Sequence, residues 1–233
     1  KRKDLVPKIL EQLKDDLSLE IPPRRVEAFD ISHLGGTNTV ASLVCFIDAR
    51  PRKTEYRKFN IKTVKGIDDF AAMREVVYRR YKRVKNKDEP TPDLILIDGG
   101  KGQLSMAVSA LRELGLDYIP VVGLAKRLEE IFVPGNSDPQ IIHKASPGLA
   151  LLKRIRDEAH RFAVTYQRQK RNKKMIESVF SSIKGMGKKR QEKLLIAFDG
   201  PEQISKLTPE VINAETAIPI KIVKEVIKLA KTI

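Results

Sequence analysis

The sequence predicts an α/β protein, with a mixed sheet and flanking helices followed by a small all-α domain. Residues 94–97 are wholly apolar and Asp98-Gly99-Gly100 follows them, as expected for a parallel strand buried on both faces. Three strand-like runs precede this strand, and their short connections favour antiparallel pairing. They lie at residues 25–31, 39–48 and 54–62. After residue 180 apolar side chains recur only at helical spacing, which predicts a separate helical domain.

The first elements are delimited by proline and glycine. Residues 4–19 carry apolar side chains at helical spacing, and Pro22-Pro23 ends this expected helix. A turn with two glycines is expected at residues 35–38, and a turn with a proline at residues 49–51. Each turn therefore separates two of the strand-like runs.

Helix and strand alternate in the middle of the chain. Asp68-Asp69 caps a helix that is expected to reach about Tyr81, and a basic loop then leads to Pro92. A further helix is expected over residues 102–114, and residues 121–124 form the fifth strand.

The last part of the first domain is predicted to be a small hairpin within residues 128–145 and a long helix from about Pro147 to Asn172. His160 lies at the border of the apolar stripe of this helix. The stripe consists of Leu152, Ile155, Ala159, Phe162, Ala163 and Tyr166.

This order of elements is that of the ribonuclease H-like fold. The first and fourth strands lie side by side in that fold, so Asp30 and Asp98 are expected to meet at the carboxyl ends of the strands, where open α/β sheets place their sites. The closing helix is expected to bring His160 to the same edge.

Asp30 and Asp98 end, or nearly end, apolar strands. A buried carboxylate costs free energy unless something compensates its charge, and a shared divalent cation is the simplest compensation. Either aspartate alone could be a strand-ending or helix-capping residue. Together they favour a site for Mg²⁺ or Mn²⁺ that acts on phosphodiesters. His160 could be a ligand or proton carrier there, or an ordinary partly buried histidine.

Neighbouring residues support this interpretation. Gly99-Gly100 permits a backbone turn close to a ligand, although it could also be a plain turn with Lys101 and Gln103 in solvent. Arg156 and Asp157 lie one helical turn before His160 and could orient its ring.

The charge of the chain is strongly and unevenly positive. Its formal net charge is +15, and residues 151–190 hold 13 Lys and Arg against 3 Asp and Glu. Such a block attracts polyanions, nucleic acid first, although a solvated charged face is the alternative. We expect domains at residues 1–172 and 181–233, joined by a basic linker at residues 173–180.

The second domain begins with a helix-hairpin-helix pattern, in which an apolar residue precedes Gly-x-Gly and a basic helix start. Backbone N–H groups of such a hairpin bind a DNA phosphate without reading bases. A plain helix start after glycine is the alternative. The candidate DNA-binding residues are Lys184, Gly185, Gly187, Lys188, Lys189 and Arg190.

Other classes of protein are disfavoured. The sequence has no apolar run long enough to span a membrane and no visible secretory signal. Its single cysteine, Cys45, lies in an apolar strand-like run and reads as a core residue in a reducing compartment. The start at Lys1 suggests a piece of a longer protein.

With these motifs the chain resembles the C-terminal half of the UvrC family, over nearly its whole length. Two segments carry the resemblance most specifically, Leu96-Ile97-Asp98-Gly99-Gly100-Lys101-Gly102-Gln103 and Ile155-Arg156-Asp157-Glu158-Ala159-His160-Arg161. The others are Phe29-Asp30-Ile31-Ser32-His33, Thr39-Val40-Ala41-Ser42, Tyr56-Arg57, Asp68-Asp69-Phe70 and Arg79-Arg80-Tyr81.

The resemblance implies a nuclease that makes the incision 5′ to a lesion in bacterial nucleotide excision repair. It implies catalytic roles for Asp30, Asp98 and His160 and supporting roles for Asp69 and Ser32. The implied substrate is damaged duplex, bubble or junction DNA, the implied loading partner is UvrB, and the implied location is the cytoplasm. The family's 3′-incision nuclease has no counterpart in these residues.

Two further expectations follow from the resemblance. The family's tail holds two helix-hairpin-helix units, and the second, near residues 216–219, lacks both hairpin glycines here. We therefore expect the first hairpin to dominate phosphate binding. A non-catalytic DNA-binding module on the same fold, or a resolvase-type nuclease, is the alternative function.

Overall fold

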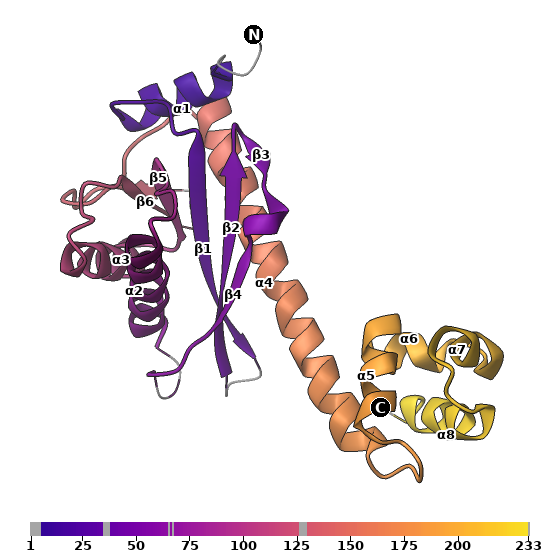
Figure 1. Cartoon of the computed structure of the whole chain (residues 1–233). Coiled ribbons are helices and arrows are strands. Elements are labelled where there is room, and N and C mark those ends of the chain that lie inside the picture. The colour runs from indigo at the N-terminus through magenta and orange to yellow at the C-terminus, as the bar shows by residue number, and fades with distance from the viewer. Residues whose placement is uncertain (1–5, 35–37, 65, 67, 126–129, 233) are drawn as a thin grey trace. The chain divides into compact units, whose positions relative to one another are not determined.

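The computed structural model describes residues 6–34, 38–64, 66, 68–125 and 130–232. The chain divides into two compact units, Lys1–Val164 and Thr165–Ile233. Figure 1 shows the elements of both units, and each unit is described by itself. No helix in the described part of the chain is both long and apolar enough to span a bilayer.

Within the described residues of the first unit, seven strands form one mixed sheet in the order β3-β2-β1-β5-β6-β7, with β4 paired to β2. β1 runs parallel to β5, with Phe29 opposite Ile97, and antiparallel to β2, with Asp30 opposite Ser42. The predicted mixed sheet and the adjacency of the first and fourth long strands are confirmed. The strands are β1 Arg25–Leu34, β2 Asn38–Ile47, β3 Arg50–Pro51, β4 Arg57–Asn60, β5 Leu94–Asp98, β6 Val121–Leu124 and β7 Ile131–Phe132.

Helices cover both faces of this sheet. One face packs against α2 (Asp69–Lys87) and α3 (Lys101–Glu113), and the other packs against α1 (Lys8–Leu17) and the first part of α4 (Pro147–Phe180). Successive strand residues point to opposite faces. The odd-numbered positions of β1 therefore enter the core beneath α2 and α3, whereas the even-numbered ones, including Asp30, face α4.

Several element boundaries differ from the prediction. α2 continues to Lys87 instead of ending at Tyr81, because Val84 is buried in the core. The third predicted strand is split into a 3₁₀ turn at Lys53–Glu55 and the short β4. β7 pairs with β6, and the expected hairpin is reduced to a single bridge between Ile131 and Gln140. The predicted turn at residues 35–38 falls largely outside the described residues.

The predicted linker is helical. α4 continues through residues 173–180 and ends at Phe180, because Ile176 and Phe180 are buried in the core of the second unit. The second compact unit begins at Thr165, before the predicted domain end at residue 172.

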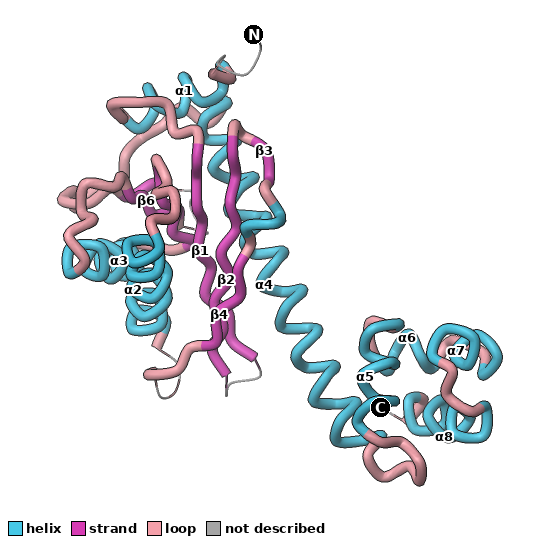
Figure 2. The backbone as a smooth tube through the Cα atoms, in the orientation of Figure 1, coloured by secondary structure: helices cyan, strands magenta, loops and turns pink. Residues whose placement is uncertain are grey.

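Figure 2 shows helices as the regular structure of the second unit. Its core joins the end of α4 to the four following helices through side chains such as Leu194, Ile212 and Val226. The helices are α5 Lys188–Ala197, α6 Pro201–Ser205, α7 Pro209–Thr216 and α8 Ile220–Ala230. The predicted small all-α region is confirmed.

Candidate metal centre

Three side chains from distant parts of the chain converge at one edge of the sheet. Asp30 lies in β1, Asp98 ends β5, and His160 lies on α4. One potential ligand atom from each of them lies within 4.8 Å of the others. The parallel register of β1 and β5 places the two aspartates side by side, and both point to the α4 face because Asp98 shares its side of β5 with Leu96.

Asp30 is the most enclosed member of this cluster, at 4% exposure. Its Oδ2 accepts a hydrogen bond of 2.6 Å from Ser32 Oγ, and its Oδ1 lies 3.5 Å from Nδ1 of His160. Ser32 lies two residues further along β1 and so faces the same side of the sheet. One carboxylate oxygen is thus held by Ser32 while the other faces the histidine, where a divalent cation could also bind.

The histidine is positioned by contacts of its neighbours on α4. Ser42 Oγ donates to the carbonyl oxygen of Ala159 at 3.0 Å, which ties the helix to the strand next to β1. Tyr56 donates its hydroxyl to Glu158 Oε1 at 3.0 Å. Buried polar contacts of this kind cost free energy to break, so they hold the register of α4 against the sheet.

The glycines after Asp98 allow a tightly folded loop. A Cβ on Gly99 would lie only 1.6 Å from Oε1 of Gln103, so this amide folds back over the Gly99 backbone. The ammonium of Lys101 lies 5.7 Å from the ring centre of Phe132. Gln103 is therefore packed on the loop that follows Asp98, whereas Lys101 is turned toward β7.

Arg156 and Asp157, which were expected to orient the His160 ring, hydrogen-bond to each other. Arg156 donates from Nε and Nη2 to Oδ1 of Asp157, at 3.0 and 2.9 Å. The His160 ring itself lies within hydrogen-bond distance of Asp30. The Asp157 side chain is 67% exposed, whereas that of Arg156 is 11% exposed.

Asp69 is also separate from the three-residue cluster. Its Oδ1 lies 2.5 Å from Nε2 of His33, and Nδ1 of that ring lies 3.1 Å from Thr39 Oγ1. His33 follows Asp30 by three residues and points to the opposite face of β1. Sequence reasoning assigned no role to His33, and strand alternation alone places it only on the face opposite Asp30.

The first hairpin of the second unit has the expected backbone. Gly185 has φ +91°, a conformation that favours glycine, and Gly187 is the N-cap residue of α5. Lys184, Lys188 and Lys189 are exposed. Arg190 instead donates from Nη1 to the Gly185 carbonyl oxygen and braces the hairpin.

The second hairpin repeats this geometry with other residues. Ala217 has φ +55°, and Pro219 is the N-cap residue of α8. Proline has no backbone N–H group, so this hairpin offers one donor fewer than the first. Ala217 N itself donates to the carbonyl oxygen of Asn213.

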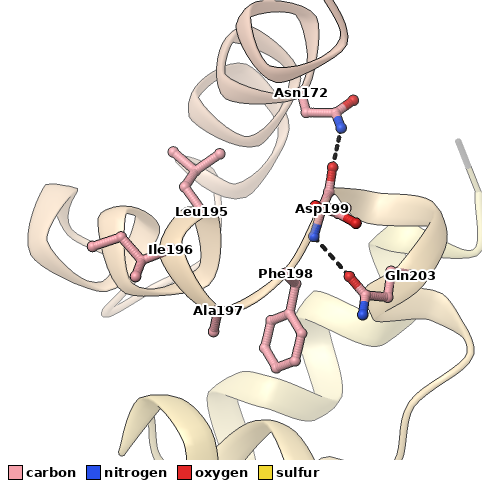
Figure 3. A pocket seen from close by; sticks show the side chains of 7 residues that line it. All are labelled: Asn172, Leu195, Ile196, Ala197, Phe198, Asp199 and Gln203. Carbon is pink, nitrogen blue, oxygen red and sulfur yellow. Dashed lines mark hydrogen bonds between the residues drawn. The ribbon is translucent and has the colours of Figure 1, made fainter. Parts of the chain in front are cut away.

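A pocket of the second unit lies between the end of α5 and α4 (Figure 3). Asn172 donates from Nδ2 to the Asp199 carbonyl oxygen, and the Asp199 N–H donates to Gln203 Oε1 at 2.7 Å. These bonds tie the α5–α6 connection to its neighbours. With one carboxylate and no histidine in its lining, the pocket offers no ligand set comparable to that of Asp30, Asp98 and His160.

Known proteins are similar in sequence to this chain over most of its length. The family model for the UvrC RNAse H endonuclease domain matches residues 14–164. UvrABC system protein C of Salinibacter ruber is 50% identical over 224 residues, which cover 95% of this chain and 35% of that protein. The corresponding protein of Prosthecochloris aestuarii is 51% identical over 89% of this chain and 33% of its own length.

The chain thus spans about a third of the length of these curated relatives. Among solved structures, an endonuclease V of Ciona intestinalis aligns with 57% of this chain and 59% of its own chain, at 16% identity and a TM-score of 0.37. The match of the family model over residues 14–164 and the high identity of the relatives lead to one conclusion: the chain belongs to the UvrC family.

Proposed function

We propose that this chain is a divalent-metal-dependent DNA endonuclease that makes the incision 5′ to a lesion in bacterial nucleotide excision repair. The observation that carries the proposal is the convergence of Asp30, Asp98 and His160, with ligand atoms within 4.8 Å of one another. The names of the relatives, which belong to the UvrABC system, support the repair context.

The donor set fits a hard divalent cation. Two carboxylates and one imidazole, with one carboxylate enclosed and its second oxygen held by Ser32, suit Mg²⁺ or Mn²⁺. When bound, such an ion supplies Lewis acidity and lowers the pKa of a bound water. Asp30 and Asp98 hold it in our proposal, and Ser32 keeps the Asp30 carboxylate in one orientation.

His160 has a second possible role because its ring is reachable from solvent. Its side chain is 43% exposed, whereas that of Asp30 is 5% exposed. An imidazole with this exposure can hold the ion or carry a proton to or from the reacting phosphate. Either role requires the ring to remain beside Asp30, and the contacts of Ala159 and Glu158 keep it there.

DNA is held elsewhere on the chain in this proposal. The first hairpin of the second unit supplies backbone N–H groups and the exposed Lys184, Lys188 and Lys189. The substrate is a bubble or a junction of single- and double-stranded DNA beside damage, and the loading partner is UvrB. The reaction takes place in the cytoplasm.

Nicking of bubble DNA tests the proposal. The full chain should cut only with Mg²⁺ or Mn²⁺ present, and on bubble DNA that carries a lesion in one strand the cut should map 5′ to that lesion. Asp30→Asn should remove cleavage and weaken Mn²⁺ binding, whereas Asp117→Asn, at an exposed acidic residue beyond the end of α3, should do neither. DNA binding without cleavage in every metal would favour a non-catalytic module, and cutting of four-way junctions would favour a resolvase-type nuclease.

A further inference from the structure

Phe70 is a large aromatic residue that remains exposed at the start of α2. It is the second residue of α2 and is 54% exposed, whereas Met73 and Val77, further along the helix, are fully buried. Its backbone N–H donates to Asp68 Oδ1 at 3.0 Å, so the start of the helix is capped and the residue is fixed in place.

The Phe70 ring is supported by a glycine of another helix. A Cβ on Gly102 would lie 2.3 Å from Cε1 and 2.7 Å from Cζ of Phe70. The ring thus occupies the space that any side chain at position 102 would need. Contact with Gly102 covers part of the ring, and more than half of the residue stays open to solvent.

The neighbours of Phe70 place it at the edge of the sheet that holds the metal centre. Gly102 lies in the first turn of α3, four residues after Asp98. Asp69 precedes Phe70 and contacts His33, three residues after Asp30 in β1. The ring therefore lies near the carboxyl end of β5, on the side of the sheet that α2 and α3 cover.

We infer that Phe70 stacks on an unpaired nucleobase of the DNA strand that is cut, close to the scissile phosphate. A fixed, half-exposed ring suits the π-face of any base, and aromatic stacking is how proteins grip single-stranded nucleic acid without reading its sequence. The net charge of +15 favours a polyanionic partner for the chain as a whole. This inference rests on the proposed function, since it assumes a DNA strand at Asp30 and Asp98.

Gly102 is needed for the Phe70 ring to keep this position. Alanine at this position would keep α3, where alanine is the better helix former, but its Cβ would displace the Phe70 ring. Gly102→Ala therefore removes the stacking surface while Phe70 itself is still present.

Fluorescence of 2-aminopurine placed in the unpaired strand of a bubble tests the inference. The full chain is titrated in metal-free buffer, with the probe at successive positions around the incision point. We expect quenching at one or two positions, loss of that quenching in Phe70→Leu and Gly102→Ala, and its retention in Phe70→Trp. Affinity for the bubble should fall about tenfold in the two disrupted variants, the usual scale for one base–aromatic stack.

Tyr118→Leu is the matched control, because Tyr118 is an exposed aromatic residue beyond the opposite end of α3. Wild-type quenching in Phe70→Leu and Gly102→Ala, or equal loss in Tyr118→Leu, would overturn the inference. Thermal melts show whether each variant is folded. If Phe70→Leu fails to fold, the quenching measured with Gly102→Ala tests the inference instead. The quenching measurement requires no cleavage. Normal cutting by Asp30→Asn would therefore refute the proposed function and leave the quenching result unchanged.

Discussion

Nδ1 of His160 lies 3.5 Å from Oδ1 of Asp30, although 130 residues separate them along the chain. The two groups differ in their surroundings, since the carboxylate is almost fully enclosed and the imidazole is 43% exposed. Asp30 is therefore the enclosed member of the candidate site, and His160 is the member that faces solvent. Substitutions of the two residues should affect metal binding, catalysis and stability differently.

Removing either carboxylate should abolish cleavage and leave DNA binding intact. Asp30→Ala or Asp98→Ala loses a candidate metal ligand, whereas affinity for DNA comes from phosphate contacts elsewhere. Nicking rates and dissociation constants for the same bubble DNA measure both quantities. Cleavage by either variant at close to the wild-type rate would contradict the assignment.

Ser32→Ala should weaken metal binding without removing a ligand. The change deletes the 2.6 Å hydrogen bond to Asp30 Oδ2 and lets the carboxylate turn. Partners that orient a metal ligand typically account for about 10- to 100-fold in affinity or activity. A Mn²⁺ titration measures the loss, with Ser105→Ala on the exposed side of α3 as the control. Equal Mn²⁺ affinities in the two variants would show that Ser32 does not orient Asp30.

His160→Ala should reduce the cleavage rate by roughly 10²-fold or more, the usual scale for one acid–base group. The fold should survive, because the ring borders the core and is 43% exposed. Single-turnover nicking and a thermal melt test the two statements together. Gross unfolding, with activity lost only in proportion, would support a packing role instead.

The sequence predicts the sheet of the first unit because its pattern is local and strong. The apolar run before Asp98 and the strand-like run around Asp30 determine which residues face α4, and therefore which side chains can form the candidate site. Element ends are harder to predict. Val84 extends α2, and Ile176 and Phe180 extend α4, because burial against other elements overrides a basic local sequence.

Contacts between distant elements account for what sequence reasoning missed. The pairing of His33 with Asp69 depends on where α2 begins relative to the end of β1, which local pattern does not reveal. The packing of Phe70 on Gly102 is of the same kind. Arg156 and Asp157 were assigned to His160 by helical spacing, but the guanidinium of Arg156 donates to the adjacent carboxylate of Asp157.

The two hairpins of the second unit should contribute unequally to DNA binding. Gly185→Val with Gly187→Val should weaken binding and flatten its salt dependence, because side chains there prevent close approach of the backbone to phosphate. Position 185 has a positive φ, and a Cβ would lie 3.0 Å from Ile222 Cδ1, so a melt must accompany the assay. Ala217→Val should have a smaller effect, since that hairpin already carries Pro219. Equal losses from both hairpins in a salt titration would refute the asymmetry.

Acid should destabilise the first unit through a buried ionic network between β1 and α2. The enclosed carboxylate of Glu27 accepts hydrogen bonds from Arg25, Arg80 and Tyr81. Hydrogen bonds from Arg25 lower the pKa of Glu55, and those from Arg80 lower the pKa of Glu89. These two outer glutamates therefore link the network to pH.

A carboxyl whose folded pKa lies below its unfolded value stabilises the protein fully above the unfolded pKa. The contribution is lost as the pH falls through the folded pKa. The free energy of unfolding should therefore fall as the pH drops below about 4.5, the ordinary pKa of glutamate. Glu89→Gln removes one titrating group and should make this decline less steep. Urea denaturation between neutral and acidic pH tests the prediction, and identical slopes for Glu89→Gln and the wild type would show that the Arg80–Glu89 pair does not link stability to pH.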